Sequence, residues 1–242
     1  MSVTAIIPAH NAERTIMRAV ESIRRQLTPT TVVVVDDAST DGTAEVSENL
    51  ADVVIRLAEN QGPAAARNAG IASVATPYVA FLDADDTWTS ARLGPMIKAL
   101  ERNGEADAVI GATRFKTPTT TSSMGFPIED GTIAVVPKFC SLLVRGDVFE
   151  VVGPIDESLR HYEDYDWMLR AADLGVGFVT LTEVVTEYQQ RRAGLSAETG
   201  PHTDVLMAVL KRSAKRKKGL SPGEAVRGRA PKWGLVDGAS GL

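Results

Sequence analysis

The stretch Tyr78-Val79-Ala80-Phe81-Leu82-Asp83-Ala84-Asp85-Asp86 joins a run of apolar residues directly to three carboxylates. Apolar side chains at this density predict a buried strand, whereas carboxylates need water, a cation or hydrogen-bond donors. The strand therefore ends at the edge of a core and carries acidic groups there. Asp83 and Asp85 are separated only by the small Ala84, so both carboxylates can reach one hard cation such as Mg²⁺. The alternative is an Asp-rich turn that ends the strand and binds nothing.

The composition indicates a soluble globular protein. The chain has 242 residues, 44% hydrophobic and 24% charged, enough for one large domain or two small ones. Its net charge of −5 argues against a nucleic-acid partner for the body as a whole. The single cysteine, Cys140, excludes an intrachain disulfide, and we expect a buried, unreactive thiol. No apolar run approaches the ~20 residues that span a bilayer, and no signal peptide precedes the first strand, so we expect a cytoplasmic location.

Strand-like and helix-like stretches alternate along the first hundred residues. Short apolar or β-branched runs predict strands at residues 3–7, 31–35, 53–57, 78–82 and 108–110. Apolar stripes with helical spacing predict helices at residues 11–27, 63–74 and 92–102, and turn chemistry predicts another helix that starts near residues 39–43. We expect Asn11 to be the N-cap of the first helix. This alternation predicts an α/β fold with a mostly parallel sheet and helices on both faces.

Polar residues follow four of these strands at the point where each strand ends. They are Pro8-Ala9-His10-Asn11, Asp36-Asp37, Glu59-Asn60-Gln61-Gly62 and Asp83-Ala84-Asp85. Parallel strands present their carboxyl ends along one edge of the sheet, and ligands of such sheets bind at that edge. The four segments are therefore expected to converge on one site although they are far apart in the chain.

The second half of the chain is less regular. Residues 117–131 are rich in Thr, Ser, Pro and Gly and predict a loop, and short strands are expected at residues 133–136, 141–144, 178–179 and 184–188. A helix is expected at residues 165–174 after Glu163 and Asp164, which the helix dipole alone would also favour there. A helical stretch after residue 203 contains a basic run from Lys211 to Lys218, and a flexible tail is expected from residue 219 onward.

Five segments, in this order, resemble the motifs of inverting GT-A fold glycosyltransferases of family 2. They are residues 6–11, residues 34–43, residues 60–70, residues 81–86 and Glu163-Asp164-Tyr165-Asp166-Trp167, and the resemblance covers residues 3–195. It implies a Rossmann-like, mostly parallel sheet with a smaller acceptor-side region. It also implies a nucleotide-sugar-binding half at residues 1–112 and, in the same domain, an acceptor-binding and catalytic-base half at residues 113–202. Residues 203–242 would form the basic helix and tail.

The resemblance implies a metal-dependent enzyme that moves a sugar from a nucleotide-sugar, with a UDP- or dTDP-sugar favoured, to an acceptor hydroxyl. The nucleotide would lie against Pro8, Ala9 and Asn11, and Asp36 and Asp37 would accept hydrogen bonds from the nucleobase or the ribose. The alternative for the two carboxylates is an Asx-turn that caps the next helix. Arg67 lies in a helix of small residues, and its fork suits a phosphate or a base edge; the alternative is a solvated arginine.

The resemblance also implies that the turn Asp83-Ala84-Asp85-Asp86, called the Asp turn below, would bind the metal and the diphosphate. Asp85 would hold Mn²⁺ or Mg²⁺ against the phosphates, Asp83 would contact the metal or the ribose, and Ala84 would lie against the donor. Asp86 is expected only to cap the turn before Trp88. Some GT-A enzymes use a C-terminal histidine as a metal ligand, which here would be His202. Arg191 and Arg192 resemble a basic segment that covers the diphosphate in such enzymes, although solvated arginines fit this pattern equally well.

The remaining catalytic role falls on the acidic pair at the start of the later helix. Inversion needs a general base on the sugar face opposite the leaving group. The resemblance implies Asp164 as that base, with Glu163 as a supporting group. Asp166 is expected to be structural, and Trp167 is expected in the core rather than as a platform for a sugar.

Two other functions use the same residues. The sequence of residues 81–87 also fits the Asp-x-Asp-x-Thr signature of haloacid-dehalogenase-like phosphatases, with Asp83 as the nucleophile and Asp85 as the acid/base, but that fold expects its signature on the first strand. A non-catalytic nucleotide-sugar-binding protein is the other alternative, and the intact Asp83, Asp85 and Asp164 argue against it.

The acceptor is open at this point: a glycan, a lipid-linked sugar or a small molecule. The chain has neither membrane-spanning segments nor the Gln-x-x-Arg-Trp segment of processive synthases in the family, since Gln189 leads to Arg192-Ala193. This favours a single transfer. The basic run from Lys211 to Lys218 fits anionic lipid headgroups at the inner face of a membrane, or alternatively a solvated helix end.

Overall fold

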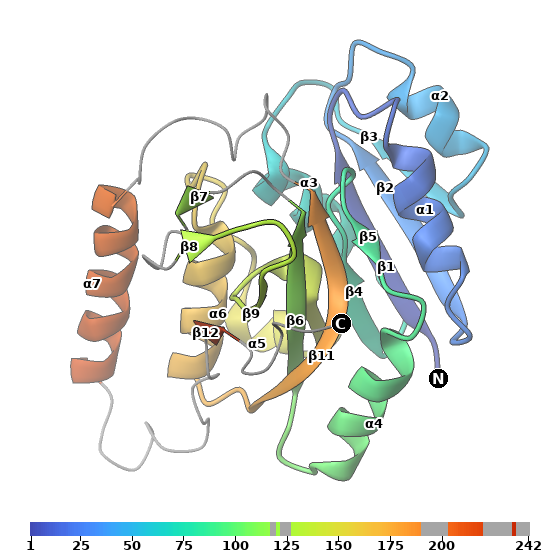
Figure 1. Cartoon of the computed structure of the whole chain (residues 1–242). Coiled ribbons are helices and arrows are strands. Elements are labelled where there is room, and N and C mark those ends of the chain that lie inside the picture. Colours follow the sequence, from blue (N-terminus) through green and yellow to red (C-terminus); the bar gives the residue numbers. More distant parts are fainter. Residues whose placement is uncertain (117–119, 122–126, 190–202, 220–233, 236–242) are drawn as a thin grey trace.

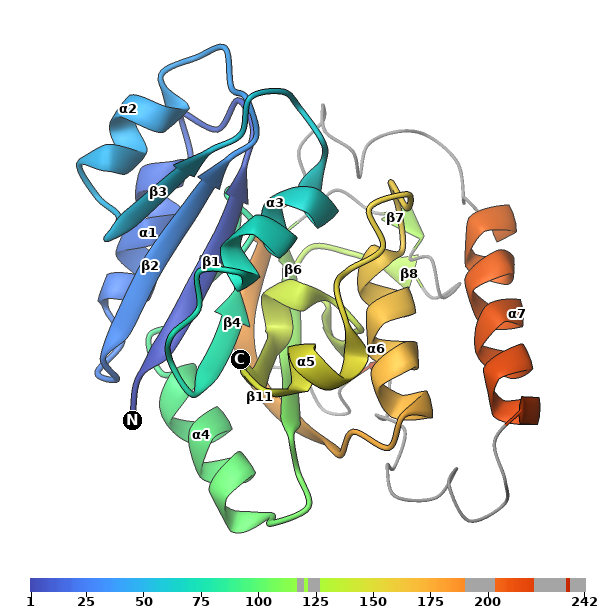
Figure 2. The same ribbon diagram turned by 180° about the vertical axis from the view of Figure 1, so that it is seen from behind.

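A computed structural model describes residues 1–116, 120–121, 127–189, 203–219 and 234–235. The strands form one large sheet whose main path runs β12-β9-β6-β10-β4-β1-β2-β3, with β11 paired to both β6 and β5. Helices cover both faces of this sheet, with α1, α2 and α4 in front in Figure 1 and α3, α5 and α6 in front in Figure 2. The predicted α/β fold class is confirmed.

The first part of the chain builds the parallel half of the sheet. Its strands are β1 (Val3–Ala9), β2 (Thr30–Asp36), β3 (Val53–Arg56) and β4 (Tyr78–Phe81), and every neighbouring pair among them is parallel. The helices between them are α1 (Ile16–Arg24), α2 (Thr43–Glu48) and α3 (Pro63–Ile71), followed by α4 (Leu93–Arg102). Side chains of β1 alternate between the two faces: Ile7 packs in the cluster that contains Ile16, and Ile6 packs in the cluster that contains Ala66.

The second part of the chain completes the sheet with mixed strand directions. Its strands are β5 (Thr87–Trp88), β6 (Ala108–Lys116), β9 (Ile133–Val135), β10 (Leu142–Arg145) and β11 (Phe178–Gln189). β10 runs antiparallel to both β4 and β6, whereas β11 runs parallel to β6 and antiparallel to β5. The short strands β7 (Thr120–Thr121) and β8 (Pro127–Ile128) form a separate pair, and β12 (Gly234–Leu235) pairs with β9.

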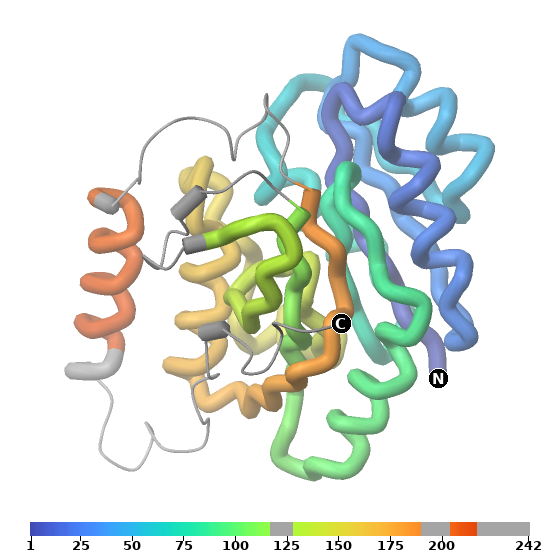
Figure 3. The backbone as a smooth tube through the Cα atoms, in the orientation of Figure 1, coloured from blue at the N-terminus to red at the C-terminus, as the bar shows by residue number. Residues whose placement is uncertain are grey.

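Helices of the second part cover the face opposite α1 and α4. α5 (Val148–Val152) and α6 (Glu163–Asp173) lie on this face, with a 3₁₀ turn at η1 (Phe139–Ser141), and α7 (Thr203–Gly219) packs against α6. The tube in Figure 3 shows α7 as the outermost element, beside α6. Arg216 of α7 donates to Asp173 of α6 at 2.8 Å, so an ion pair helps to hold α7 in place.

The strand order reverses between β1 and β4. The chain passes from β1 outward to β2 and β3, and then returns to place β4 on the other side of β1. Ile6 of β1 is in register with Phe81 of β4, and Ala9 is in register with Asp36 of β2. The residues that follow these strands therefore lie at one edge of the sheet, where such folds bind ligands.

Several local expectations were wrong. The first helix starts at Ile16 rather than at Asn11, because Asn11 adopts a left-handed conformation with φ of 49°. Its side-chain oxygen instead accepts from the main-chain N–H of Thr40 at 2.9 Å, so it caps the neighbouring loop and not its own helix.

Other differences concern strand lengths. The two short strands expected at residues 178–179 and 184–188 are one strand, β11, with register shifts against β6. The expected loop at residues 117–131 contains β7 and β8, and part of the expected tail forms β12. β5 and α5 were not predicted, since two and five residues are too few for periodicity to show.

Aromatic side chains form the centre of the core under α6. Trp167 is fully buried, and its ring centroid lies 4.8 Å from that of Phe149 and 5.8 Å from that of Phe139. Its indole N–H donates to the carbonyl oxygen of Gly153 at 3.1 Å. The expectation that Trp167 belongs to the core is confirmed.

The buried Arg92, directly before α4, holds η1, β10 and β11 together. Arg92 donates to the carbonyl oxygens of Cys140 and Leu142 and to the Thr186 hydroxyl, and its guanidinium lies 4.2 Å from the ring centroid of Trp88. Burial lowers the pKa of Arg92 to about 9. Its hydrogen bonds fix η1, and hence Cys140, beside the Asp turn.

Close packing of α3 on β1 yields a first prediction. A Cβ atom on Gly70 would lie 2.5 Å from Cγ2 of the buried Ile6, so Gly70→Ala should lower the free energy of unfolding by about 1–3 kcal/mol. Gly104→Ala is the matched control, because nothing lies within 4 Å of its Cβ, and it should change stability by less than about 0.5 kcal/mol. Chemical denaturation measures both. Equal effects of the two substitutions would contradict the packing of α3.

Candidate active site

A buried arginine lies at the centre of the candidate site. Arg67 on α3 donates from Nη2 to Asp83 Oδ1 at 2.6 Å and from Nη1 to Glu163 Oε1 at 2.9 Å. Its guanidinium also lies 5.2 Å from the ring centroid of Phe139. Burial disfavours the charge on Arg67, but the negative Asp83, Glu163 and Asp164 outweigh this effect and raise its pKa above the ordinary value. Arg67 is therefore a permanent cation between two carboxylates.

The loop before α3 places this arginine. Gly62 has φ of 90°, a left-handed conformation that favours glycine, and Pro63 then starts the helix. The carboxylate of Asp37 accepts the main-chain N–H groups of Gln61 and Gly62, each at 2.8 Å. The end of β2 is thereby joined to the start of α3, and the Asp36-Asp37 pair does more than form an Asx-turn in its own loop.

The ends of β1 and β2 form an adjoining polar surface. His10 Nδ1 lies 2.7 Å from the carbonyl oxygen of Asp37, and Asn11 Nδ2 lies 3.2 Å from His10 Nε2. These contacts fit a histidine that donates from Nδ1 and accepts at Nε2. Asp36 is only 4% exposed, and its Oδ1 has no hydrogen-bond partner among the described residues. A buried acceptor without a partner is suited to a ligand donor.

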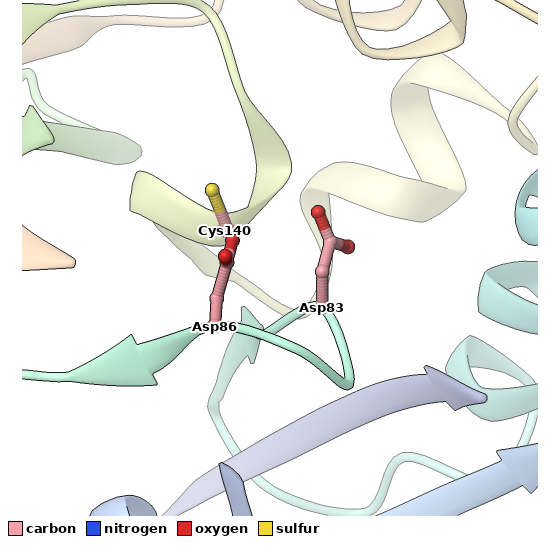
Figure 4. A group of neighbouring side chains, drawn as sticks. All are labelled: Asp83, Asp86 and Cys140. Atoms are coloured by element: carbon pink, nitrogen blue, oxygen red, sulfur yellow. The ribbon is translucent and has the colours of Figure 1, made fainter. Parts of the chain in front are cut away.

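The Asp turn after β4 brings three potential metal ligands together. Donor atoms of Asp83, Asp86 and Cys140 lie within 4.8 Å of one another, and Figure 4 shows the Asp86 and Cys140 side chains beside each other. Asp86 is fully buried; its Oδ1 accepts the Gln189 N–H at 2.8 Å, and its Oδ2 lacks a partner in the described part of the chain. These residues can hold a divalent cation.

Protonation of this group depends on burial. Burial raises the pKa of Asp86 well above its ordinary value, and the nearby Asp83 and Asp85 raise it further. Burial also raises the pKa of Cys140, and Asp86 and Asp83 act in the same direction. Asp85, which the sequence suggested as the main metal ligand, is half-buried and is not in this group; its main-chain oxygen accepts from Arg18 Nη2 at 2.8 Å. Its role as a ligand stays a prediction.

Asp164 occupies the first turn of α6, beside Glu163. Burial, and after it the negative charge of Glu163, raise the pKa of Asp164 to about 7, while Lys138 and Arg67 act in the opposite direction. Asp164 Oδ1 accepts the N–H of Tyr165 at 2.9 Å. A carboxylate with this pKa can take up a proton at neutral pH, which is what a general base requires.

Three residues of the site were missed by sequence reasoning. Asp86 was expected only to cap a turn, Cys140 only to be buried, and Lys138 was not considered. Lys138 Nζ lies 4.6 Å from the ring centroid of Tyr188. Burial opposes its charge, but the interaction with Tyr188 and the negative charges of Asp164 and Asp83 raise the pKa of Lys138 well above its ordinary value. The signal in the sequence was weak, since Lys138 and Cys140 lie in the short segment between β9 and β10, which shows no recognisable motif.

Some predicted site residues cannot be placed. Arg191, Arg192 and His202 lie outside the described residues. Pro8 and Ala9 are the last residues of β1, which runs two residues beyond the predicted strand, and Ala9 is in register with Asp36. Ala84 is 8% exposed in the Asp turn. Among the described residues, the structure thus brings those predicted to contact the donor to one edge of the sheet, where Arg67 joins Asp83 to Glu163, the neighbour of Asp164.

Comparisons with known proteins agree with this geometry. The model of the family described as "Glycosyl transferase family 2" matches residues 4–138, more than half of the chain. The succinoglycan biosynthesis protein ExoU of Rhizobium meliloti is 35% identical over 203 residues, which cover 73% of this chain and 58% of that protein. Glycosyltransferase AglE of Haloferax volcanii is 30% identical over 211 residues, which cover 79% of this chain and 68% of that protein.

Solved structures show the same fold. The crystal structure of S. aureus TarS 1–349 in complex with UDP-GlcNAc has a TM-score of 0.71 at 20% identity and covers 89% of this chain and 66% of that one. The mannosyltransferase PcManGT from Pyrobaculum calidifontis, in complex with GDP-Man and Mn²⁺, has a TM-score of 0.66 at 22% identity, with 88% and 64% covered. The chain spans about three fifths of the length of the first of the relatives above.

The burial of Cys140 yields the second prediction. The thiol is 1% exposed and its pKa is raised by burial, so at neutral pH iodoacetamide should modify the folded protein at least about 100-fold more slowly than the unfolded one. Mass spectrometry measures the rates, and Cys140→Ser is the control because the chain has no other cysteine. Equal rates in the folded and unfolded protein would contradict this placement of η1.

Proposed function

Because the chain belongs to glycosyl transferase family 2, we propose that it is a glycosyltransferase that inverts the anomeric centre as it moves a sugar from a nucleotide-sugar to an acceptor hydroxyl. One observation carries the proposal. Arg67 brings together the Asp turn at the end of β4 and the first turn of α6, which carries Asp164. Asp83, which is proposed to face the donor, and Asp164, whose pKa is about 7, thus belong to one site.

The nucleotide is proposed to bind over the ends of β1 and β2. The Oδ1 of Asp36, which has no hydrogen-bond partner among the described residues, can accept from a nucleobase N–H. Pro8 and Ala9 at the end of β1, and Asn11 after it, are proposed to line the same surface. Asp37 orders the loop before α3 that faces this surface. UDP- and dTDP-sugars are the favoured donors; the related folds noted above were solved with UDP-GlcNAc or GDP-Man.

The Asp turn has a donor set that fits a hard divalent cation. The carboxylates of Asp83 and Asp85 are proposed to hold Mn²⁺ or Mg²⁺. The Oδ2 of the buried Asp86, which has no hydrogen-bond partner among the described residues, adds a further oxygen close to Asp83. A bound cation would neutralise charge on the departing diphosphate. His202 as a further ligand, and Arg191 and Arg192 as diphosphate contacts, belong to the same proposal.

Asp164 is proposed to be the general base, with Glu163 as its support. Its carboxylate takes the proton from the acceptor hydroxyl while that oxygen forms a bond to the anomeric carbon. The bond from this carbon to the diphosphate breaks, and the nucleoside diphosphate leaves with the electron pair. Attack on the face opposite the leaving group inverts the configuration. Because only the unprotonated base works, kcat should fall as the pH drops below about 7.

The alternative functions have less support. The Asp-x-Asp-x-Thr segment follows β4, the fourth strand of the chain, whereas the phosphatase fold expects it after the first. The family match also favours the transferase. A protein that binds a nucleotide-sugar without catalysis would not need a carboxylate with a pKa near 7 beside the Asp turn.

The acceptor is proposed to be a glycan, a lipid-linked sugar or a small molecule that approaches from the side of α6 and β9. Within the described residues, no helix has the length and apolar character of a membrane span. Arg212 and Arg216 in the basic run of α7 are engaged with Asp156 and Asp173, while Lys211 and Lys215 are exposed. Peripheral contact with anionic lipid would use these two lysines.

The third prediction tests the base. Asp164→Asn should lower kcat by about 100-fold or more, because the amide cannot take up the proton, while a nucleoside diphosphate with Mn²⁺ still raises the melting temperature. Asp147→Asn is the matched control: Asp147 is exposed after β10, at the opposite edge of the sheet, and its substitution should leave both quantities unchanged.

Analysis of the product completes this test. Nuclear magnetic resonance should show the opposite anomeric configuration in the product and in the donor. Retained configuration, or full activity of Asp164→Asn, would contradict the proposed mechanism. A phosphoryl group trapped on Asp83 would support the phosphatase instead.

A further inference from the structure

We propose that Arg67 is a positioning residue for catalysis: by binding Asp83 and Glu163 at once, it fixes the first turn of α6 against the Asp turn and so orients Asp164 toward the donor. This inference rests on the proposed function. It assigns to Arg67 a task different from direct recognition of phosphate or base, which was the expectation from its sequence context.

The contacts of Arg67 leave its fork little freedom. The Asp83 and Glu163 carboxylates occupy Nη2 and Nη1 at 2.6 and 2.9 Å, and the arginine side chain is only 6% exposed. Phe139 covers one face of the guanidinium at 5.2 Å. Both terminal nitrogens are therefore engaged before any donor binds, and only Nε lacks a hydrogen-bond partner within the described residues. Arg67 is thus proposed to act through the two carboxylates that it joins.

The first turn of α6 depends on this bond more than the rest of the helix does. The body of α6 is fixed by Trp167 in the core, and Arg170 donates to the carbonyl oxygens of Val152 and Pro154 at 2.8 and 2.7 Å. Glu163 lies at the start of the helix, directly before Asp164. Within the described part of the chain, the bond from Arg67 ties Glu163 to the side of the site that carries Asp83.

A forked cation is needed for this task. A guanidinium presents several N–H groups in one plane and can bind two carboxylates in different directions, whereas an ammonium is a compact charge on a flexible stem. Arg67 lies 16 residues before Asp83 and 96 residues before Glu163 in the chain, so the bridge joins two separate parts of the fold.

The pH dependence of kcat distinguishes an effect of charge on Asp164 from an effect of packing alone. The charged groups that act on Asp164 are Glu163 of its own helix, Lys138 after β9 and Arg67 of α3. A positive neighbour lowers the pKa of a carboxylate and a negative neighbour raises it. The acidic limb of the pH–rate profile is the fall of kcat at low pH. Removing Arg67 should therefore shift this limb to higher pH, and removing the charge of Glu163 should shift it to lower pH.

The fourth prediction compares Arg67→Gln, Arg67→Lys and Glu163→Gln in the full chain with a nucleotide-sugar and Mn²⁺. Arg67→Gln should lower kcat by about 10- to 100-fold and raise the acidic limb by about one pH unit, while Glu163→Gln should lower the limb. Arg67→Lys keeps the charge, so its limb should stay near that of the wild type, yet kcat should still fall about 10-fold. The double variant Arg67→Lys/Glu163→Gln should have a kcat only slightly below that of the more impaired single variant, because both substitutions break the same bond between Arg67 and Glu163.

Arg170→Gln is the control for loss of a structural arginine on α6. It should lower the melting temperature and leave the acidic limb in place, because Arg170 is paired with Asp166 and main-chain oxygens rather than with Asp164. If the Arg67 variants behave like Arg170→Gln, with lower stability and an unmoved limb, the positioning role is wrong.

Two other outcomes would overturn the proposal. Wild-type kcat at saturating donor, combined with lost binding of the nucleoside diphosphate, would make Arg67 a donor ligand. Wild-type kcat in Arg67→Lys would show that the fork is not needed. Failure of the proposed function itself is distinguishable, because it would appear as full activity of Asp164→Asn while the Arg67 variants were still impaired.

Discussion

The guanidinium of Arg67 lies almost out of contact with solvent, between the carboxylates of Asp83 and Glu163. A buried charge is tolerated only when it is paired, and removal of one partner of a buried pair typically costs about 3–5 kcal/mol. The pair itself need not add net stability. Its effect is to allow few arrangements of α3, the Asp turn and α6, because any other arrangement would leave a charge buried without a partner.

Much of the fold could be predicted because the strands are marked by short apolar or β-branched runs in the sequence. The β-branched run of β2 and the apolar run of β4 each lead directly into carboxylates, and parallel pairing then brings these ends to one edge. Where prediction failed, a tertiary contact had overridden a local preference. Asn11 is a good N-cap by residue type, yet its side chain bonds across to Thr40, so the helix begins five residues later.

The site could be predicted only as far as its motifs extend along the chain. Asp83, Arg67, Glu163 and Asp164 each stand in a recognisable segment, and the structure brings those segments together. Nothing in the sequence shows that Arg67 binds Glu163, because 96 residues separate them. Asp86, Lys138 and Cys140 were missed for the same reason: they matter only through the neighbours that folding gives them, and no residue spacing carries that information.

A crystal structure with a nucleoside diphosphate and Mn²⁺ bound would test the central claim most directly, namely that Arg67 holds the donor-side turn and the catalytic base in one site. The account predicts the diphosphate at the Asp turn, the Asp164 carboxylate facing the position of the anomeric carbon from the side opposite the leaving phosphate, and Arg67 still bonded to Glu163. A diphosphate bound away from the Asp turn, or an Arg67 that has left Glu163 to bind phosphate, would contradict it.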